Sequence, residues 1–270
     1  MSRVSINTDK CKKDGSCALV CPEAIFVQKD KATTPEIFHE EECIACGQCV
    51  SICPQGAVVH ADFPSDRVRS INQELIPSGE QVLELLKTRR SVRALRDRPV
   101  ERDLIEKIID AARFAPSARN SQSTEYIVVQ DKAVLRKILE LTTLHQARVI
   151  QRVSNPLPAF ARLIRAFENG QDQILHNAPV LVLFHADRRN EFAEVNAALA
   201  LQNAALICHG FGLGSFFAGY VTAVCQQDDS IPRLLTIPEN HVIYGALAIG
   251  YPKLKFKNLM ERDPAKTIWI

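Results

Sequence analysis

The sequence lacks the features of a membrane-spanning, secreted or nucleic-acid-binding protein. Its longest apolar run, APVLVLF, is far shorter than the ~20 residues that a membrane-spanning helix needs. The segment MSRVSINTDK contains no apolar signal region, so we expect no secretory signal and a cytoplasmic location. A formal net charge of +2 is too small for a nucleic-acid interface. We therefore expect a soluble protein that binds neither membranes nor nucleic acid.

Cysteine is nearly absent from most of the chain and dense in its first part. Seven of the nine cysteines lie between Cys11 and Cys53. In a reducing compartment this density indicates metal ligands rather than disulfides. Residues 1–62 carry 6 Lys and Arg against 9 Asp and Glu, although the whole chain is net positive, which indicates two modules. The isolated Cys208 and Cys225 are predicted to be small buried apolar residues.

The densest cysteine motif begins at residue 43 and reads CIACGQCVSICP, a C-x2-C-x2-C-x3-C-P run. Thiolates are soft donors that suit iron and sulfide, and the short spacers bring three of them around one cluster. A structural zinc site is the alternative, but it ordinarily uses two C-x2-C pairs separated by a longer span. The third cysteine and the final proline favour an iron–sulfur cluster.

An earlier run, CKKDGSCALVCP at residues 11–22, superposes on the run at residues 43–54 when the chain is shifted by 32 positions; in chain order these are the first and the second run. The matched pairs are Cys11/Cys43, Gly15/Gly47, Cys17/Cys49, Cys21/Cys53 and Pro22/Pro54. Asp14 falls on Cys46, so an aspartate stands where the first run lacks a cysteine. The segments AIFVQ and AVVHA also superpose, which predicts a duplicated fold with a helical turn and a strand in each half.

Residues 1–62 resemble the two-cluster bacterial ferredoxins, in which the fourth cysteine of each run binds the other run's cluster. The resemblance implies a first donor set of Cys11, Asp14, Cys17 and Cys53. It implies a second donor set of Cys21, Cys43, Cys46 and Cys49. The second set is expected to hold a 4Fe-4S cluster. Because a carboxylate is a harder donor than a thiolate, the first set is expected to hold a 4Fe-4S or a 3Fe-4S cluster, unless Asp14 is a solvated loop acid that never touches iron.

The rest of the chain has a mixed helical and strand pattern. Residues 63–79 contain two Pro and one Gly without periodicity, which predicts a linker. Ser78 and Gln81 form a capping box for a helix through EQVLELLKTRR, and a second helix is predicted in ERDLIEKIIDAARFA. YIVVQ, VLVLFH and VIYGALAIG are predicted as buried strands. This interrupted order of helices and strands indicates an α+β fold. The segment GFGLG at residues 210–214 follows a helical pattern, so it indicates a turn that ends a helix rather than a dinucleotide-binding motif.

Two polar segments flank the second predicted helix. RRSVR at residues 89–93 offers three guanidinium groups and a hydroxyl that suit a phosphate, and APSARNSQ at residues 115–122 is a polar turn. At this spacing, residues 80–270 resemble the flavin-dependent nitroreductase family, an α+β domain that binds FMN between the subunits of a homodimer. LQNAALICHGFGLGSFFAGY and AIGYPK resemble the family's long central helix and last strand.

This second resemblance implies an FMN site with two groups of residues. The residues implied at the phosphate are Arg89, Arg90, Ser91 and Arg93, with Lys255 and Lys257 as further cations. The residues implied at the flavin ring are Ser117, Asn120 and Gln122. Ser123 and Thr124 stand where many members have Pro-Trp, which predicts a more polar pocket. Because the flavin itself carries the redox chemistry, no residue is assigned a catalytic role. This includes the three scattered histidines His145, His176 and His185.

Residues 145–176, rich in Arg and Pro, are predicted to form a helical excursion or lid. The segment contains the cations Arg148, Arg152, Arg162 and Arg165. These side chains either bind an anionic substrate or form a solvent-exposed face. The C-terminal TIWI is predicted to pack on a partner subunit.

The two modules together predict a flavin-dependent oxidoreductase. Clusters carry single electrons and FMN passes a pair, so the expected route runs from the clusters to FMN and then to a small planar acceptor such as a nitroaromatic. The expected donor is a redox protein such as ferredoxin, with NAD(P)H as the alternative. An electron carrier or redox sensor, and a reductive dehalogenase-like or flavin-modifying enzyme, are the alternative functions.

Overall fold

The computed structural model describes residues 2–152 and 158–270 of the chain. They form two compact units: Met1–Pro77 with Arg119–Ser121, and Ser78–Ala118 with Gln122–Ile270. No helix of the described residues is long and apolar enough to cross a membrane. Residues 153–157, inside the predicted lid, lie outside the described residues.

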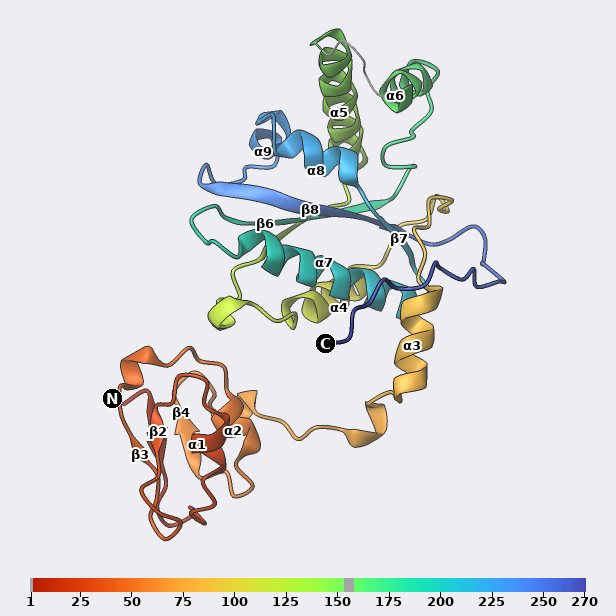
Figure 1. The fold of residues 1–270 in the computed structure, drawn as a ribbon. Helices are drawn as coiled ribbons and strands as arrows, with labels where there is room; N and C mark the ends of the chain where they lie inside the picture. The colour runs from red at the N-terminus through yellow and green to blue at the C-terminus, as the bar shows by residue number, and fades with distance from the viewer. Residues whose placement is uncertain (1, 153–157) are drawn as a thin grey trace. The chain divides into compact units, whose positions relative to one another are not determined.

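The first unit contains two small antiparallel sheets and two short helices (Figure 1). Strand β1 pairs with β4, and β2 pairs with β3. The elements are β1 (Val4–Ile6), α1 (Ser16–Val20), β2 (Phe26–Val27), β3 (Glu36–Ile37), the 3-10 turn η1 (Glu40–Glu42), α2 (Gln48–Ile52) and β4 (Val58–His60). The predicted duplication is confirmed in its local structure, because the predicted helical turn and strand occur in each half, α1 with β2 and α2 with β4; one further strand precedes the cysteine run of each half, β1 and β3.

Two glycines at equivalent positions start the two helices of this unit. Gly15 precedes α1 with φ 74°, and Gly47 precedes α2 with φ 72°. Glycine adopts this left-handed conformation without the strain that a Cβ atom brings. Cys17 and Cys49, each the second residue of its helix, are therefore turned into a small core with Val4.

The predicted linker contains two 3-10 turns, η2 (Ser65–Arg67) and η3 (Gln73–Leu75), and its residues up to Pro77 group with the first unit. Helix α3 (Gly79–Thr88) follows, and its capping box between Ser78 and Gln81 is present as predicted. The helix ends one residue before Arg89, which is its C-cap. The apolar side chains Val82 and Leu86 of α3 are 37% and 46% exposed on the chain.

The second unit is built on an antiparallel sheet of order β5-β6-β8-β7, which bears out the predicted α+β class. The predicted strands YIVVQ, VLVLFH and VIYGALAIG are all present, but YIVVQ was wrongly predicted to be buried: it forms an edge strand of the sheet, where Val128 is 40% exposed. The strands are β5 (Glu125–Val129), β6 (Val180–Asp187), β7 (Gly214–Phe217) and β8 (His241–Gly250). The other elements are α4 (Arg102–Arg113), the 3-10 turn η4 (Ala118–Asn120), α5 (Lys132–Arg152), α6 (Pro158–Glu168), α7 (Ala193–Gly210), α8 (Gly219–Cys225) and α9 (Ser230–Leu234).

Helices cover both faces of this sheet (Figure 1). Helices α4 and α7 pack on one face, where Val182 and Phe184 of β6 are fully buried. Helices α5, α8 and α9 pack on the other face against Leu181 and Leu183, the alternate residues of the same strand. The strand is apolar on both faces because both are covered.

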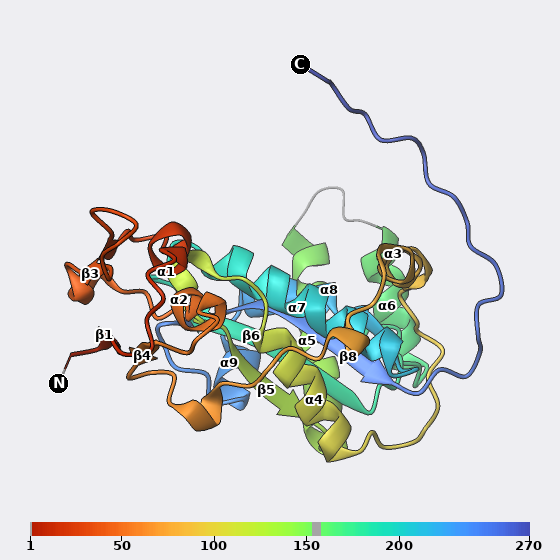
Figure 2. The same cartoon turned by 90° about the horizontal axis from the view of Figure 1, so that it is seen from below.

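The turn GFGLG connects α7 to β7, as predicted, with Gly212 in the left-handed region at φ 73°. The chain after β8 runs as an extended segment to the C-terminus (Figure 2). Its apolar end is solvent-exposed, with Trp269 at 92%.

Candidate functional site

The cysteines of the first unit line two separate small cavities. One cavity is lined by the four residues of the first donor set, Cys11, Asp14, Cys17 and Cys53. The other is lined by the four residues of the second donor set, Cys21, Cys43, Cys46 and Cys49. The last cysteine of each run thus lies with the first three positions of the other run.

The donor chemistry of both cavities suits iron–sulfur clusters. All of these cysteines are free thiols. Burial raises the pKa of Cys17, and it raises the pKa of Cys49 to about 11. A buried thiolate is therefore unfavourable unless a cation compensates its charge, which iron does when it replaces the thiol proton.

Asp14 is the one carboxylate of the two donor sets. It is exposed at the first cavity, and its Oδ1 accepts a hydrogen bond of 2.9 Å from the Ser16 backbone. Hydrogen bonds from Ser16 lower the pKa of Asp14, so the group is ionised at neutral pH. The carboxylate is held at the start of α1, beside the thiols of its set.

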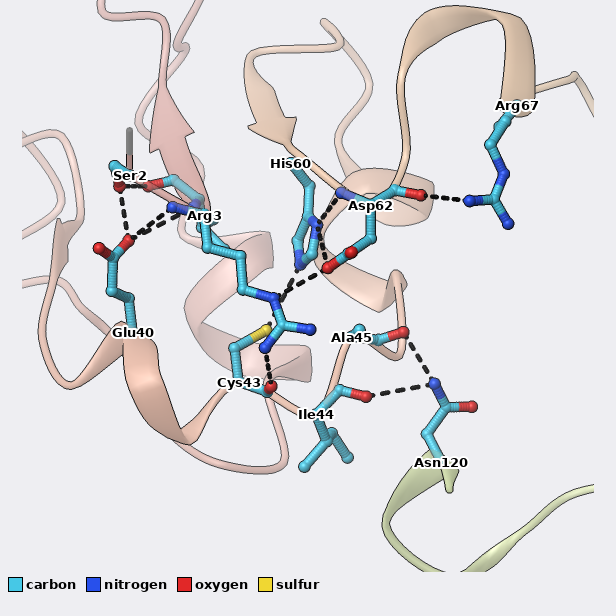
Figure 3. A network of polar contacts seen from close by, with 11 residues as sticks. Ser2, Arg3, Glu40, Cys43, Ile44, Ala45, His60, Asp62, Arg67 and Asn120 are labelled. Carbon is cyan, nitrogen blue, oxygen red and sulfur yellow. Dashed lines mark hydrogen bonds and ion pairs between the residues drawn. The ribbon is translucent and has the colours of Figure 1, made fainter. Parts of the chain in front are cut away.

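His60 is a residue of this site that the sequence analysis did not single out. It ends β4 and is buried, and its Nε2 atom lies 3.4 Å from the Cys43 sulfur (Figure 3). Arg3 donates a hydrogen bond of 2.7 Å to the Cys43 carbonyl oxygen and forms an ion pair with Asp62. The 32-residue shift pairs His60 with Gln28. This difference between the two halves is the sequence signal that could have identified His60.

The second unit contains a cavity of about 720 Å³ between helices α5, α6 and α8 and strand β7. Arg93 lies in its wall with the guanidinium 5.4 Å from the centroid of the Phe216 ring. Phe160 and Arg162 of the predicted lid also line this cavity. Its volume lies within the range of small-molecule binding sites, and its lining combines aromatic rings with cationic side chains.

The RRSVR segment is fixed against strand β7. Ser91 forms a parallel bridge with Ser215, and the Val92 backbone N–H donates a hydrogen bond of 2.9 Å to the Ser215 carbonyl. Gly214 permits this approach, because a Cβ atom there would lie 2.8 Å from Val92 Cγ1. The positions of the three arginines are therefore set by pairing to the sheet edge.

The cations implied at the phosphate are divided between two cavities. Arg90, Lys255 and Lys257 line a second cavity of about 330 Å³, in which the Arg90 guanidinium lies 5.7 Å from the centroid of the Phe256 ring. Arg93 lines the larger cavity instead. Arg89 lines neither of them, so a phosphate-binding cluster of all five cations is not assembled in either cavity.

The residues implied at the flavin ring line neither of these two cavities. Ser117 Oγ accepts a hydrogen bond of 3.0 Å from the Gln122 backbone N–H in the second unit. Asn120 groups with the first unit, where its amide donates to the carbonyl oxygens of Ile44 and Ala45 at 3.2 and 2.8 Å (Figure 3). Asn120 and Gln122 have positive φ, so this loop has a specific backbone conformation.

Some of the remaining cationic and histidine side chains of the predicted lid line the larger cavity, and others do not. His176 and His145 line the larger cavity, whereas Arg148 pairs with Asp228 at 3.3 Å. Gln146, missed by the sequence analysis, is buried in the same wall, and its Oε1 has no hydrogen-bond partner among the described residues. His185, outside the lid, hydrogen bonds to His241 at 2.9 Å.

The two isolated cysteines behave as predicted. Cys208 and Cys225 are buried in the second unit. Burial raises the pKa of each thiol to about 12, which makes both unreactive and structural.

Comparison with known proteins matches each unit to a family. Residues 86–251, more than half of the chain, match the Nitroreductase family, and residues 3–54 match the 4Fe-4S dicluster domain. A protein of Methanothermobacter thermautotrophicus, whose name assigns it provisionally as an NADH dehydrogenase/NAD(P)H nitroreductase, is 32% identical over 179 residues. The match covers 65% of this chain and 79% of that protein.

One further relative and one solved structure are also similar to the second unit. Iodotyrosine deiodinase of Drosophila melanogaster is 27% identical over 195 residues, 67% of this chain and 66% of the deiodinase. The solved structure of a Bacteroides fragilis nitroreductase with bound FMN superposes with a TM-score of 0.58 at 26% identity, covering 70% of this chain and 98% of that one. This chain is therefore a member of the nitroreductase family of oxidoreductases, with a 4Fe-4S dicluster domain ahead of its nitroreductase domain.

Proposed function

We propose that this chain is an FMN-dependent reductase in which iron–sulfur clusters pass electrons to the flavin for reduction of a small planar acceptor such as a nitroaromatic. The observation that supports this most is the grouping of the seven N-terminal cysteines and Asp14 into two sets of four donors, in a chain that also has a nitroreductase domain. Bound clusters supply single electrons, and bound FMN collects them and passes a pair.

The second donor set holds a 4Fe-4S cluster in this proposal, because it offers four thiolates. The first donor set holds a 4Fe-4S cluster with Asp14 as the fourth ligand, or a 3Fe-4S cluster without it. The carboxylate binds this iron more weakly than a thiolate, so the fourth iron of the first set is the labile one.

FMN binds the second unit in this proposal, as it binds the Bacteroides fragilis nitroreductase. The 720 Å³ cavity, with Arg93 in its wall, takes the planar acceptor. The family resemblance assigns the FMN phosphate to Arg89, Arg90, Ser91, Arg93, Lys255 and Lys257, and the flavin ring to Ser117, Asn120 and Gln122. On the single chain the ring residues do not line the acceptor cavity, and the phosphate cations are not gathered in one cavity.

The lid side of the larger cavity selects the acceptor. Phe160 offers a ring for stacking, and Arg162 offers a cation for an anionic or nitro group. The buried Gln146 Oε1 atom, which accepts no hydrogen bond from the described residues, favours a ligand or water that donates a hydrogen bond to it.

The protein acts as a homodimer in this proposal. Apolar side chains of α3 and α7 lie exposed on the single chain, among them Val82 at 37%, Leu86 at 46% and Val195 at 56%, and Trp269 of the C-terminal tail is 92% exposed. A second copy of the chain would bury such side chains. Sedimentation at twice the chain mass of 30.1 kDa is the expected result, and sedimentation at 30.1 kDa contradicts it.

Reductive dehalogenation is a second candidate function, favoured by the similarity to iodotyrosine deiodinase. Both reactions place a planar electrophile on the flavin, so the fold does not separate them. An electron carrier differs from both, because it exchanges electrons rapidly with a protein partner and turns over a small acceptor slowly.

Anaerobic purification tests the proposal. Iron, sulfide and FMN are measured in the protein as isolated, and turnover is then measured with a nitroaromatic and with a halogenated phenol. The proposal predicts iron, sulfide and FMN together with repeated nitroaromatic turnover. Zinc in place of iron and sulfide, or a protein that binds no FMN, contradicts it.

A further inference from the structure

A side chain of the first unit lies against a sulfur of the second donor set. The His60 ring is buried at the end of β4, and its Nε2 atom is 3.4 Å from Cys43 Sγ (Figure 3). A distance of 3.4 Å is within the range of an N–H···S hydrogen bond, which is longer than N–H···O because sulfur is larger. The direction of this bond depends on which ring nitrogen carries the proton.

The backbone fixes the position of that proton. The Asp62 backbone N–H donates a hydrogen bond of 3.1 Å to His60 Nδ1, so Nδ1 is an acceptor and carries no hydrogen. An imidazole ring whose Nδ1 accepts a hydrogen bond carries its hydrogen on Nε2, and here Nε2 faces Cys43 Sγ.

The surroundings of His60 hold the ring in this orientation. The Phe63 ring packs against it at 5.0 Å between centroids. Asp62 is in turn bound by Arg3, whose Nε donates to Oδ2 at 2.8 Å while Nη1 donates to the Cys43 carbonyl at 2.7 Å. The backbone N–H of Arg3 also donates to Glu40, so the network joins β1, β4 and the start of the cysteine run (Figure 3).

The first half of the unit has no equivalent of this contact among its described hydrogen bonds. Gln28, the counterpart of His60, donates its amide hydrogens to the carbonyl oxygens of Lys13 and Thr33, both at 2.9 Å. The sulfurs of Cys11 and Cys53 accept instead from backbone N–H groups. A side-chain donor to a ligand sulfur is therefore a property of the second donor set.

We propose that His60 is a positioning residue that raises the reduction potential of the cluster on the second donor set through its hydrogen bond to Cys43. Reduction adds negative charge that spreads onto the ligand sulfurs, and a donor aimed at a sulfur stabilises the reduced state more than the oxidised one. The inference rests on the proposed function, because it requires a cluster on Cys21, Cys43, Cys46 and Cys49.

The first test uses the unmodified chain with histidine labelled by ¹⁵N. Pulsed EPR of the reduced second cluster is expected to show a coupling to a ¹⁵N nucleus, transmitted through the N–H···S bond. Protein with unlabelled histidine is the control. A reduced second cluster without any histidine nitrogen coupling overturns the proposal, and this result does not depend on the folding of a variant.

The second test is potentiometric titration of His60→Leu, His60→Gln and Gln28→Leu, with the clusters followed by EPR. At a fixed ambient potential, His60→Leu is expected to lower the reduced-to-oxidised ratio of the second cluster about tenfold, which is about 59 mV for one electron. His60→Gln keeps an N–H donor and is expected to restore part of this loss. Gln28→Leu is expected to leave the ratio of the second cluster unchanged.

The outcomes separate this inference from the proposed function. Native protein without iron and sulfide defeats the proposed function and the inference together. Two intact clusters with an equal second-cluster potential in native and His60→Leu protein defeat the inference alone. A shift of equal size in Gln28→Leu also defeats it, because the effect is then not specific to the contact with Cys43.

Discussion

The two halves of the first unit have the same backbone plan and different chemistry. Each half starts a short helix after a left-handed glycine, Gly15 or Gly47, and turns the next cysteine into the core. The first half places Asp14 where the second places Cys46, and Gln28 where the second places His60. One half therefore has three thiols and a carboxylate, and the other has four thiols and an imidazole donor.

The two halves share a backbone frame, whereas the side chains around their cavities differ. Glycine spacing and the small core determine where the sulfurs lie. Single substitutions at the cavity walls then determine how firmly each site holds iron and at what potential it accepts an electron. Substitutions at equivalent positions test that statement directly.

The largest effect is expected for the last cysteine of each run. Cys21→Ala is expected to remove the cluster of the second donor set although Cys21 belongs to the first run, and Cys53→Ala is expected to remove the cluster of the first set. Each variant is expected to lose about half of the iron, because one of two clusters is lost. Iron analysis with EPR identifies the remaining cluster; loss confined to the run that carries the mutation contradicts the exchange of ligands.

A reciprocal exchange tests the difference between Asp14 and Cys46. Asp14→Cys is expected to give the first set four thiolates and a more stable cluster under mild oxidation, while Cys46→Asp is expected to make the second cluster the labile one. Low-temperature EPR before and after exposure to oxidant measures this. An unchanged first-cluster spectrum in Asp14→Cys means that the carboxylate takes no part in binding iron.

A smaller effect is expected for the helix-starting glycines. Gly47→Ala is expected to cost about 1–2 kcal/mol of stability for its left-handed φ alone. A further cost is expected because the new Cβ would lie 3.0 Å from the Phe63 ring. Gly56→Ala is the matched control, with positive φ and open space around it. Anaerobic urea denaturation followed by cluster absorbance measures both, and equal midpoints would show that the Phe63 contact adds nothing.

The smallest effect is expected for the cysteines outside the two halves. Cys208 and Cys225 have pKa values raised to about 12 by burial, so at pH 8 about one thiol in ten thousand is ionised. Iodoacetamide is expected to leave both unmodified in the native protein and to modify the cluster cysteines after iron is removed. Peptide mass spectrometry measures the modification, and rapid labelling of Cys208 would contradict its burial.

The sequence predicted the frame of the first unit well because cysteine spacing and glycine position act over a few residues. It did not predict the contact of His60 with Cys43, which depends on β4 returning beside β1. Composition gives no sign of such a contact. In the internal repeat, the only sign of it is that Gln28 and His60, which occupy equivalent positions, are different residues.

The second unit shows the same limit. Strand β6 was predicted from an apolar run that is buried on both faces, whereas the burial predicted for β5 was wrong because β5 lies at the sheet edge. The distribution of Arg90 and Arg93 over two cavities was not predicted, since it depends on the bridge between Ser91 and Ser215. Phe160 and Gln146 were missed because helical residues of a lid have no sequence signature until α5 and α6 pack over the sheet.

The proposed function requires that the clusters deliver electrons to the flavin. Nitroaromatic turnover tests this requirement when it is driven by reduced ferredoxin and separately by NADH, in native protein and in a Cys17→Ala/Cys49→Ala variant that lacks both clusters and keeps FMN. Ferredoxin-driven turnover is expected in the native protein and is expected to be lost in the variant. Full NADH-driven turnover by the cluster-free variant, equal to the native rate, would contradict it.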